Sequence, residues 1–106
     1  MNAYRIFELK DGKLKTLFHG VDGSRVIERG RWYKAKTSIV TDGGQPYRAG
    51  FHVFRTRAIC RSYLRRFTAD RQLVVRRVEV EDTWAKKTNP DVVLARWMFV
   101  PTKGRK

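Results

Sequence analysis

The alternation of apolar and polar residues at the start of the chain predicts a β-hairpin. Asn2–Leu9 and Lys13–Phe18 are two short runs rich in aromatic and branched side chains, which is typical of β-strands. Asp11 and Gly12 stand between them. A tight type I′ turn requires positive φ at both central positions, and Asp-Gly adopts that conformation readily. We therefore expect two antiparallel strands joined by a two-residue turn.

The middle of the chain predicts two more strands with a loop between them. Arg31–Lys36 reads as a strand, and glycine and proline mark a loop over Asp42–Pro46. Tyr47–Phe54 then predicts a strand that runs directly into a helix, for which Thr56 is a suitable N-cap. The helix is therefore expected to start where a strand ends.

The predicted helix, Arg57–Phe67, combines an apolar stripe with a basic face. Its apolar residues follow the i, i+1, i+4, i+5, i+8 spacing of a helix that packs on a core. They are Ile59, Cys60, Tyr63, Leu64 and Phe67. Arg57, Arg61 and Arg65 recur every fourth residue on another face, without glutamates at i±4 to compensate their repulsion. The basic face indicates either a solvated helix surface or a surface that binds anions.

The last third of the chain predicts two long strands. Leu73–Glu81 alternates, with arginine and glutamate on one side and valine on the other. Asn89 and Pro90 break the pattern. Val92–Val100 is almost continuously apolar, as in a central strand that is covered on both faces, and Pro101 ends it.

Together these elements predict an α+β fold. It consists of a small, mostly antiparallel sheet of about five to six strands with one amphipathic, arginine-rich helix. The expected organisation is a single domain over residues 1–102 with a basic tail at 103–106. Because one helix cannot cover a whole sheet, we expect the sheet to curl or to pair with a second molecule.

The net charge and its distribution along the chain indicate more about function than the pattern of apolar and polar residues does. The 106 residues carry a formal net charge of +14, and nine arginines but only one acid, Asp70, lie between Arg48 and Arg77. Such a field attracts a polyanion: nucleic acid, an anionic membrane surface or an acidic protein. No apolar run has the length of a membrane span or the character of a signal peptide. We therefore expect a cytoplasmic protein without a membrane partner.

The expected partner is nucleic acid, alone or in a nucleoprotein. Guanidinium groups match phosphate oxygens bidentately, and bases stack on aromatic rings that are interleaved with cations. The residues expected to make these contacts are Arg48, Arg55, Arg57, Arg61, Arg65, Arg66, Arg76, Arg77, Trp32 and Tyr33. For the two aromatic residues a core role is the alternative, because strand alternation must turn one of them inward.

Cysteine and histidine give little evidence of catalysis. The single Cys60 excludes an internal disulfide and a four-cysteine zinc site, and is predicted as a small core residue, with an arginine-acidified thiol as the alternative. His19 and His52 have no metal-ligand spacing, so no metal or other cofactor is expected. His52 is expected to point away from Phe51 and Val53. It then either donates to a backbone carbonyl or acts in catalysis.

Two parts of the chain resemble motifs of the ADP-ribosyltransferase and RNA 2′-phosphotransferase fold. Leu17–Gly20 is similar to its opening His-Gly motif, Ile27–Gly30 to the isoleucine-glycine pair after it, and Gly50–Phe54 with Ala58 and Tyr63 to its second motif. The resemblance implies contact of the His-Gly strand with the nicotinamide ribose of NAD. It gives the alternative hypothesis of a minimal or degenerate transferase that uses His19 and His52.

A second resemblance covers nearly the whole chain. The layout is similar to that of small uncharacterised proteins encoded by bacteriophages and prophages, at Tyr4, Phe7, Gly12–Leu14, Gly30, Trp32, Tyr33, Ala35, Ala49–Phe54 and Val92–Met98. It implies an accessory role against a host cell. We therefore expect a non-enzymatic protein that binds nucleic acid or a host nucleoprotein through its arginine-rich face. A further hypothesis is an inhibitor that contacts a host defence protein directly.

Overall fold

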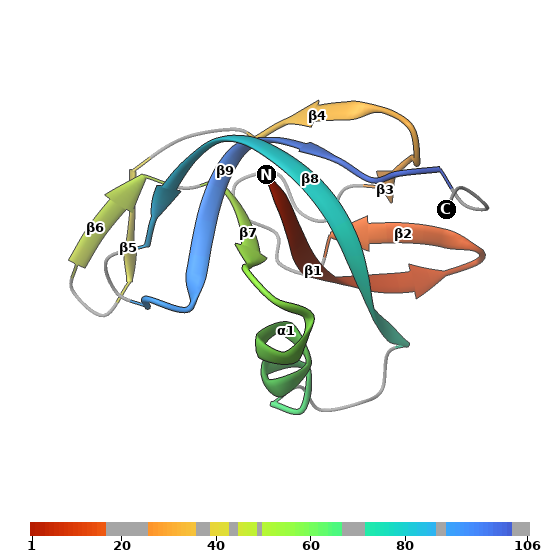
Figure 1. The fold of residues 1–106 in the computed structure, drawn as a ribbon, viewed down its shortest axis with the longest axis horizontal. Coiled ribbons are helices and arrows are strands. Elements are labelled where there is room, and N and C mark those ends of the chain that lie inside the picture. Colours follow the sequence, from red (N-terminus) through yellow and green to blue (C-terminus); the bar gives the residue numbers. More distant parts are fainter. Residues whose placement is uncertain are drawn as a thin grey trace.

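The computed structural model of the protein confirms the α+β fold (Figure 1). It describes residues 1–16, 26–35, 39–42, 45–48, 50–66, 72–86 and 89–102, and of 39–42 and 45–48 only the backbone. The elements are β1 (Asn2–Lys10), β2 (Lys13–Thr16), β3 (Val26–Ile27), β4 (Trp32–Lys34), β5 (Ile39–Asp42), β6 (Gln45–Arg48), β7 (Phe51–Phe54), α1 (Arg57–Leu64), β8 (Leu73–Ala85) and β9 (Val92–Phe99). The described strands number nine, more than expected. The predicted tail at 103–106 lies outside the described residues.

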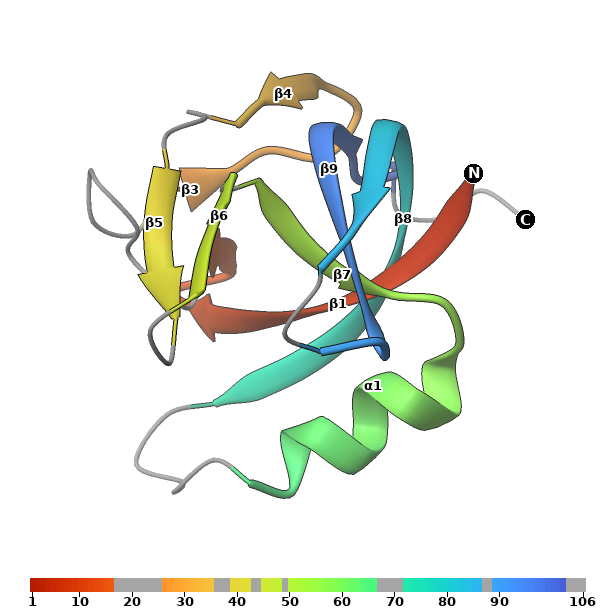
Figure 2. The same ribbon diagram turned by 90° about the vertical axis from the view of Figure 1, so that its left-hand side faces the viewer.

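The main sheet curls into a small barrel. β1 pairs with β8, β8 with β9, β9 with β7, and β7 again with β1, all antiparallel, so the four pairings close a cycle. β2 and β3 extend the sheet beyond β1, and β4 extends it beyond β9. Figure 2 shows the strands of the cycle crossing one another steeply, as in a strongly twisted sheet. Because the sheet closes on itself, it does not need more than one helix to cover it, as the expected curling requires.

The predicted hairpin and central strand are both confirmed. Asp11 and Gly12 have φ of 53° and 76°, the positive values that the turn requires, and Lys10 pairs with Lys13 across it. β9 has a neighbour on each edge: β8 along its whole length, and β7 and then β4 on the other side. Val92, Val93, Leu94 and Ala95 are all buried, which explains the continuous apolar run.

The single strand predicted over Tyr47–Phe54 is wrong, because the structure divides it between two sheets. Gln45–Arg48 pairs with the unforeseen strand β5, whereas Phe51–Phe54 joins the barrel. Gly50 lies at the start of the barrel strand, where an added Cβ would be 2.8 Å from the Ala95 carbonyl oxygen. The close approach to β9 requires glycine there. An alternating sequence gives no sign of which partner strand each half selects.

The inward and outward alternation of side chains inverts in both β8 and β9 at the same level of the barrel. Val78 and Val80 belong to the interior core, but Trp84 packs on the outer side, so the alternation of β8 inverts between them. Asp82, with φ of 57°, stands at the inversion, and its Oδ2 lies 2.9 Å from Nε of Arg96 on β9. The predicted strand ended at Glu81 because the alternating pattern stops where the strand turns over.

Helix α1 packs against the outside of the barrel, on β1, β7 and β8. Its N-cap is confirmed: Thr56 Oγ1 accepts a hydrogen bond from Ile59 N at 3.1 Å. The apolar stripe is also confirmed over its described part. Ile59, Cys60, Tyr63 and Leu64 form an outer core with Tyr4, Ile6, Phe54, Leu94 and neighbouring side chains. Phe67 lies outside the described residues.

A buried arginine, which the sequence analysis did not identify, completes the barrel where β1 and β7 diverge. The pairing of these strands is confined to Tyr4 and Phe54. One step further along, Nη1 of Arg5 donates to the His52 carbonyl oxygen at 2.8 Å. The Arg5 guanidinium also lies 5.6 Å from the ring centroids of Phe7 and Phe51, and the residue is 7% exposed. A side chain therefore replaces strand pairing at this seam.

Candidate nucleic-acid interface

Most of the predicted arginines lie on α1, its flanks and β8. Six of them are exposed: Arg55, Arg57, Arg61, Arg65, Arg66 and Arg77. Arg76 is half-buried, and the side chain of Arg48 lies outside the described residues. We call the six exposed arginines the arginine surface. Arg57 and Arg61 follow one edge of α1, about 6 Å apart along the axis, and Arg65 continues that row as the C-cap residue, because the helix ends at Leu64 rather than at the predicted Phe67.

Tyr4 joins the helical and the strand parts of the arginine surface. The Arg57 guanidinium lies over the Tyr4 ring, with Cζ 4.9 Å from its centroid. On the neighbouring strand Tyr4 is paired directly with Arg77, whose Nη1 donates to Asn2 Oδ1 at 3.2 Å. Directly paired residues share one face of a sheet. Tyr4 therefore stacks with an arginine of the helix and has another arginine, on β8, as its strand partner.

Arg76 lies on the other face of β8 from Arg77. It pairs across the sheet with the buried Arg5, and its Nη1 donates to the Val75 carbonyl oxygen at 3.0 Å. The pKa of Arg76 is lowered, first by burial and then by the positive charges of Arg29 and Arg57. Repulsion from these like charges disfavours the protonated form of Arg76.

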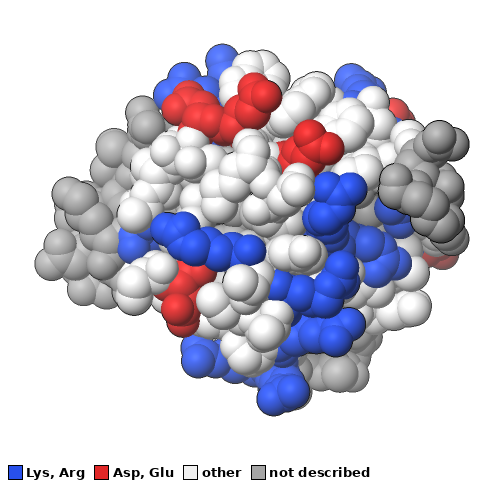
Figure 3. All heavy atoms as spheres, in the orientation of Figure 1, with Lys and Arg blue, Asp and Glu red and all other residues white. Residues whose placement is uncertain are grey.

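No described carboxylate pairs with the arginine surface. Among the residues that the structure describes, its six arginines form no ion pair, whereas Arg31 pairs with Glu28 and Arg96 with Asp82. In Figure 3 the basic side chains gather over the lower part of β8 and toward α1, and acidic ones lie mainly along the upper edge. Charge is therefore segregated on this face of the molecule.

The aromatic candidates lie apart from the arginine surface. β4, which carries both, is at the opposite end of the molecule from α1 (Figures 1 and 2). Trp32 is 41% exposed, with its ring centroid 5.3 Å from that of Phe99. Phe99 is paired on its other side with Glu79. The carboxylate thus shares the face of Trp32, which is unfavourable for a phosphate beside that ring.

Tyr33 is the aromatic residue that strand alternation turns inward. It packs against the interior core, and its hydroxyl accepts a hydrogen bond from Glu28 N at 2.9 Å. The Arg31 guanidinium lies 5.4 Å from the ring centroid. These contacts give Tyr33 a structural role in holding the segment between β3 and β4.

His52 points away from Phe51 and Val53, as expected. Both neighbours are buried in the interior core, whereas His52 is half-buried on the other side, with Nε2 3.3 Å from Lys86 Nζ. His19 lies outside the described residues, so the structure does not place the two histidines relative to each other. Within the described ranges, no three His, Cys, Asp or Glu residues are grouped as a metal site requires.

Cys60 is a core residue, which contradicts the alternative of an acidified thiol. Its side chain is fully buried under α1. Burial raises the pKa of the thiol from its usual value to about 11, against the smaller opposing influences of Arg5 and Arg57. The neutral thiol is therefore the native form at physiological pH.

We predict that Cys60 resists modification until the protein unfolds. In the native protein near neutral pH, an aromatic disulfide reagent should react at a small fraction of the rate seen in denaturant. Because the folded pKa of about 11 exceeds the unfolded value, this group contributes stability below about pH 9 and loses it as the pH rises through 11. The unfolding free energy of Cys60→Ala should accordingly fall less over that range. Rapid native labelling would contradict the prediction.

In the part of the chain that the structure describes, no helix has both the length and the apolar character needed to cross a membrane. Comparison with known proteins adds no relative: no protein-family model, curated protein or solved structure matches this chain.

Proposed function

We propose that this protein binds nucleic acid, alone or within a nucleoprotein, by holding the phosphate backbone on its arginine surface. The observation that supports this most strongly is that Arg57 stacks on Tyr4, whose strand partner on β8 is Arg77. Arginines of the helix and of β8 are therefore gathered on the same face of the sheet. Guanidinium forks spaced about one helical turn apart can each reach a different phosphate group.

The composition of the surface favours nucleic acid over a lipid bilayer. An interfacial helix inserts exposed apolar side chains beside its basic ones. The large exposed hydrophobic residues that the structure describes are Met1, Val26 and Trp32, and none of them lies on α1. The apolar stripe of the helix is already used to cover the barrel. Phosphate contact therefore needs no rearrangement of the core.

The dependence of affinity on salt tests this function. Each phosphate that an arginine neutralises releases counterions, so about four to six contacts predict a log–log slope near −4 to −5 on duplex DNA. Fluorescence anisotropy of a labelled duplex over a series of salt concentrations measures that slope. Polyglutamate serves as the control polyanion and should compete poorly. Tight binding that does not change with salt would contradict a phosphate-based interface.

A further inference from the structure

The outer surface of β4, β9 and β8 carries aromatic rings beside carboxylates. In one row across the three strands, Trp32 is paired with Phe99, and Phe99 with Glu79. Directly paired residues share one face of a sheet. The ring centroids of Trp32 and Phe99 are 5.3 Å apart, and Trp32 is exposed while the other two residues are half-buried. The row therefore offers two adjacent rings with a carboxylate at one end.

The next row has a similar composition and already holds a cation. Lys34 is paired with Trp97, and Trp97 with Glu81. Lys34 Nζ lies 5.8 Å from the centroid of the Trp97 ring, which is within the range of a cation–π contact. Among the residues that the structure describes, none places a cation over Trp32 or Phe99. The first row thus has the rings and the carboxylate of such a site without the cation. We call the two rows together the acidic–aromatic face.

The carboxylates of this face are not neutralised by described residues. Glu79 and Glu81 form no ion pair in the described part of the chain. Arg77 lies two residues before Glu79 on the same face of β8, but it donates to the Asn2 side chain instead. In Figure 3 acidic side chains lie mainly along the upper edge, apart from the basic ones. In a protein of net charge +14, this is a local reversal of charge that favours a cation over a phosphate.

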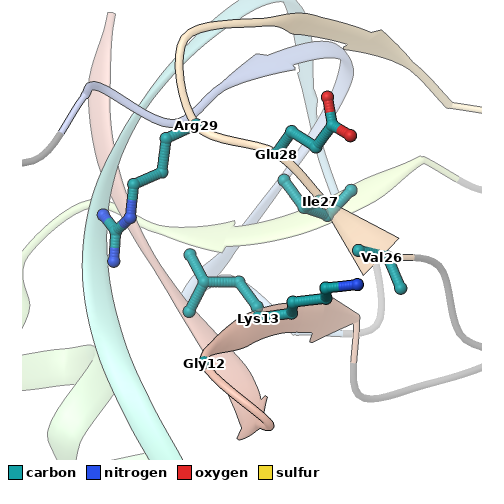
Figure 4. Close-up of a pocket in the computed structure, with 7 residues that line it drawn as sticks. Gly12, Lys13, Val26, Ile27, Glu28 and Arg29 are labelled. Carbon is teal, nitrogen blue, oxygen red and sulfur yellow. The ribbon is translucent and has the colours of Figure 1, made fainter.

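A pocket of about 290 Å³ between the start of β2 and the segment after β3 is less suited to a cation (Figure 4). The side chains of Lys13 and Arg29 stand on opposite sides of it. Glu28 is the acidic residue of its described lining, and that carboxylate lies 3.3 Å from Nη1 of Arg31. The pocket is therefore positively charged, and a cation is better placed on the acidic–aromatic face.

We propose that the acidic–aromatic face binds a lysine- or arginine-bearing segment of a partner protein. A cation of that segment lies over the rings of Trp32 and Phe99, and Glu79 neutralises it. The contact between Lys34 and Trp97 is its internal counterpart. A protein segment fits better than a small free cation, because the rings and carboxylates lie on a sheet surface that extends over two rows. Aromatic side chains are enriched in protein interfaces, and complementary charge makes the contact specific. The inference goes beyond the function proposed above and does not need the arginine surface to bind nucleic acid.

The test is a calorimetric titration with a short unlabelled peptide of alternating arginine and serine. The control peptide has glutamine in place of arginine and should bind at least about tenfold more weakly. At physiological ionic strength the Debye length is about 8 Å, so carboxylates beside the bound cation outweigh the more distant arginine surface. In NMR spectra the indole N–H signal of Trp32 should shift during the titration. The signal of Trp84, which packs in the outer core, should not.

Single substitutions show whether the peptide binds on this face. Trp32→Ala should weaken the arginine peptide about tenfold and Glu79→Gln about fivefold. Trp32→Phe retains a ring and should recover most of the affinity. Asp11→Asn is the matched control for Glu79→Gln, because it removes one carboxylate at the hairpin turn, where asparagine tolerates the positive φ of 53°. Its affinity should stay within about twofold of the unmodified protein.

Failure of this inference is distinguishable from failure of the proposed function. The inference is overturned if the arginine peptide does not bind, if both peptides bind equally, or if Trp32→Ala and Glu79→Gln both keep full affinity. Trp32→Ala should bind duplex DNA within about twofold of the unmodified protein. A large loss there would assign the ring to the nucleic-acid interface and overturn the inference. Thermal melting checks the fold, and Glu79→Gln alone decides the question if Trp32→Ala does not fold.

Discussion

Replacing Arg57, Arg61 and Arg65 together with glutamine should weaken nucleic-acid binding about hundredfold at physiological salt and leave the fold intact. All three are exposed, and none forms an ion pair with a described carboxylate. Glutamine keeps helix propensity while it removes the charge. The salt slope should become less steep by about three, because each lost phosphate contact contributes about 0.9. The loss should be uniform across sequences, since contacts to phosphate carry no base information.

The control for this prediction removes the same amount of charge elsewhere. Arg61→Gln with Arg65→Gln is compared with Arg31→Gln with Lys34→Gln, which lies on and beside β4 at the other end of the molecule (Figure 1). Net charge alone would weaken both pairs equally. A local interface predicts a large loss for the helix pair and a small one for the β4 pair. Unfolding of the triple variant would instead show that the helix arginines have a structural role.

Arg5→Ala should destabilise the protein by about 3–5 kcal/mol, a large fraction of the stability of a small domain. The substitution removes the donor to the His52 carbonyl oxygen and the guanidinium that lies near Phe7 and Phe51. It leaves a cavity and an unpaired carbonyl at the seam between β1 and β7. Chemical denaturation followed by tryptophan fluorescence measures the change.

Arg5→Lys separates charge from shape at the same position. Lysine retains the positive charge but lacks the planar fork, so it should recover only part of the lost stability. Arg61→Ala, on the exposed face of α1, should change the stability by about 0.5 kcal/mol or less. If Arg5→Ala is as stable as the unmodified protein, the free energy lost in burying the guanidinium equals the free energy that its contacts contribute.

Several elements could be predicted because their cause is local. The Asp11-Gly12 turn depends on two backbone conformations, and the start of α1 depends on one hydroxyl group, that of Thr56. The apolar stripe of the helix indicates that one face is buried, and the continuous apolar run of β9 indicates that both faces are buried. The high positive charge and its concentration in arginine were likewise evident without a fold.

What the sequence could not determine depends on which strands become neighbours. The separation of Gln45–Arg48 from Phe51–Phe54 is set by their different partner strands, and Gly50 records only a close approach to β9. The sequence pattern gave no sign that Arg5 is buried, because its burial arises only where β1 and β7 diverge in the closed barrel.

The same division holds for the candidate site. The sequence by itself determined the basic face of one helix, since i, i+4 spacing is a local property. Only the tertiary structure paired Arg77 with Tyr4 and placed β4, which carries Trp32, at a distance from α1. Those distances are fixed by strand pairing and barrel closure, which act between residues far apart in the chain and leave no periodic trace in it.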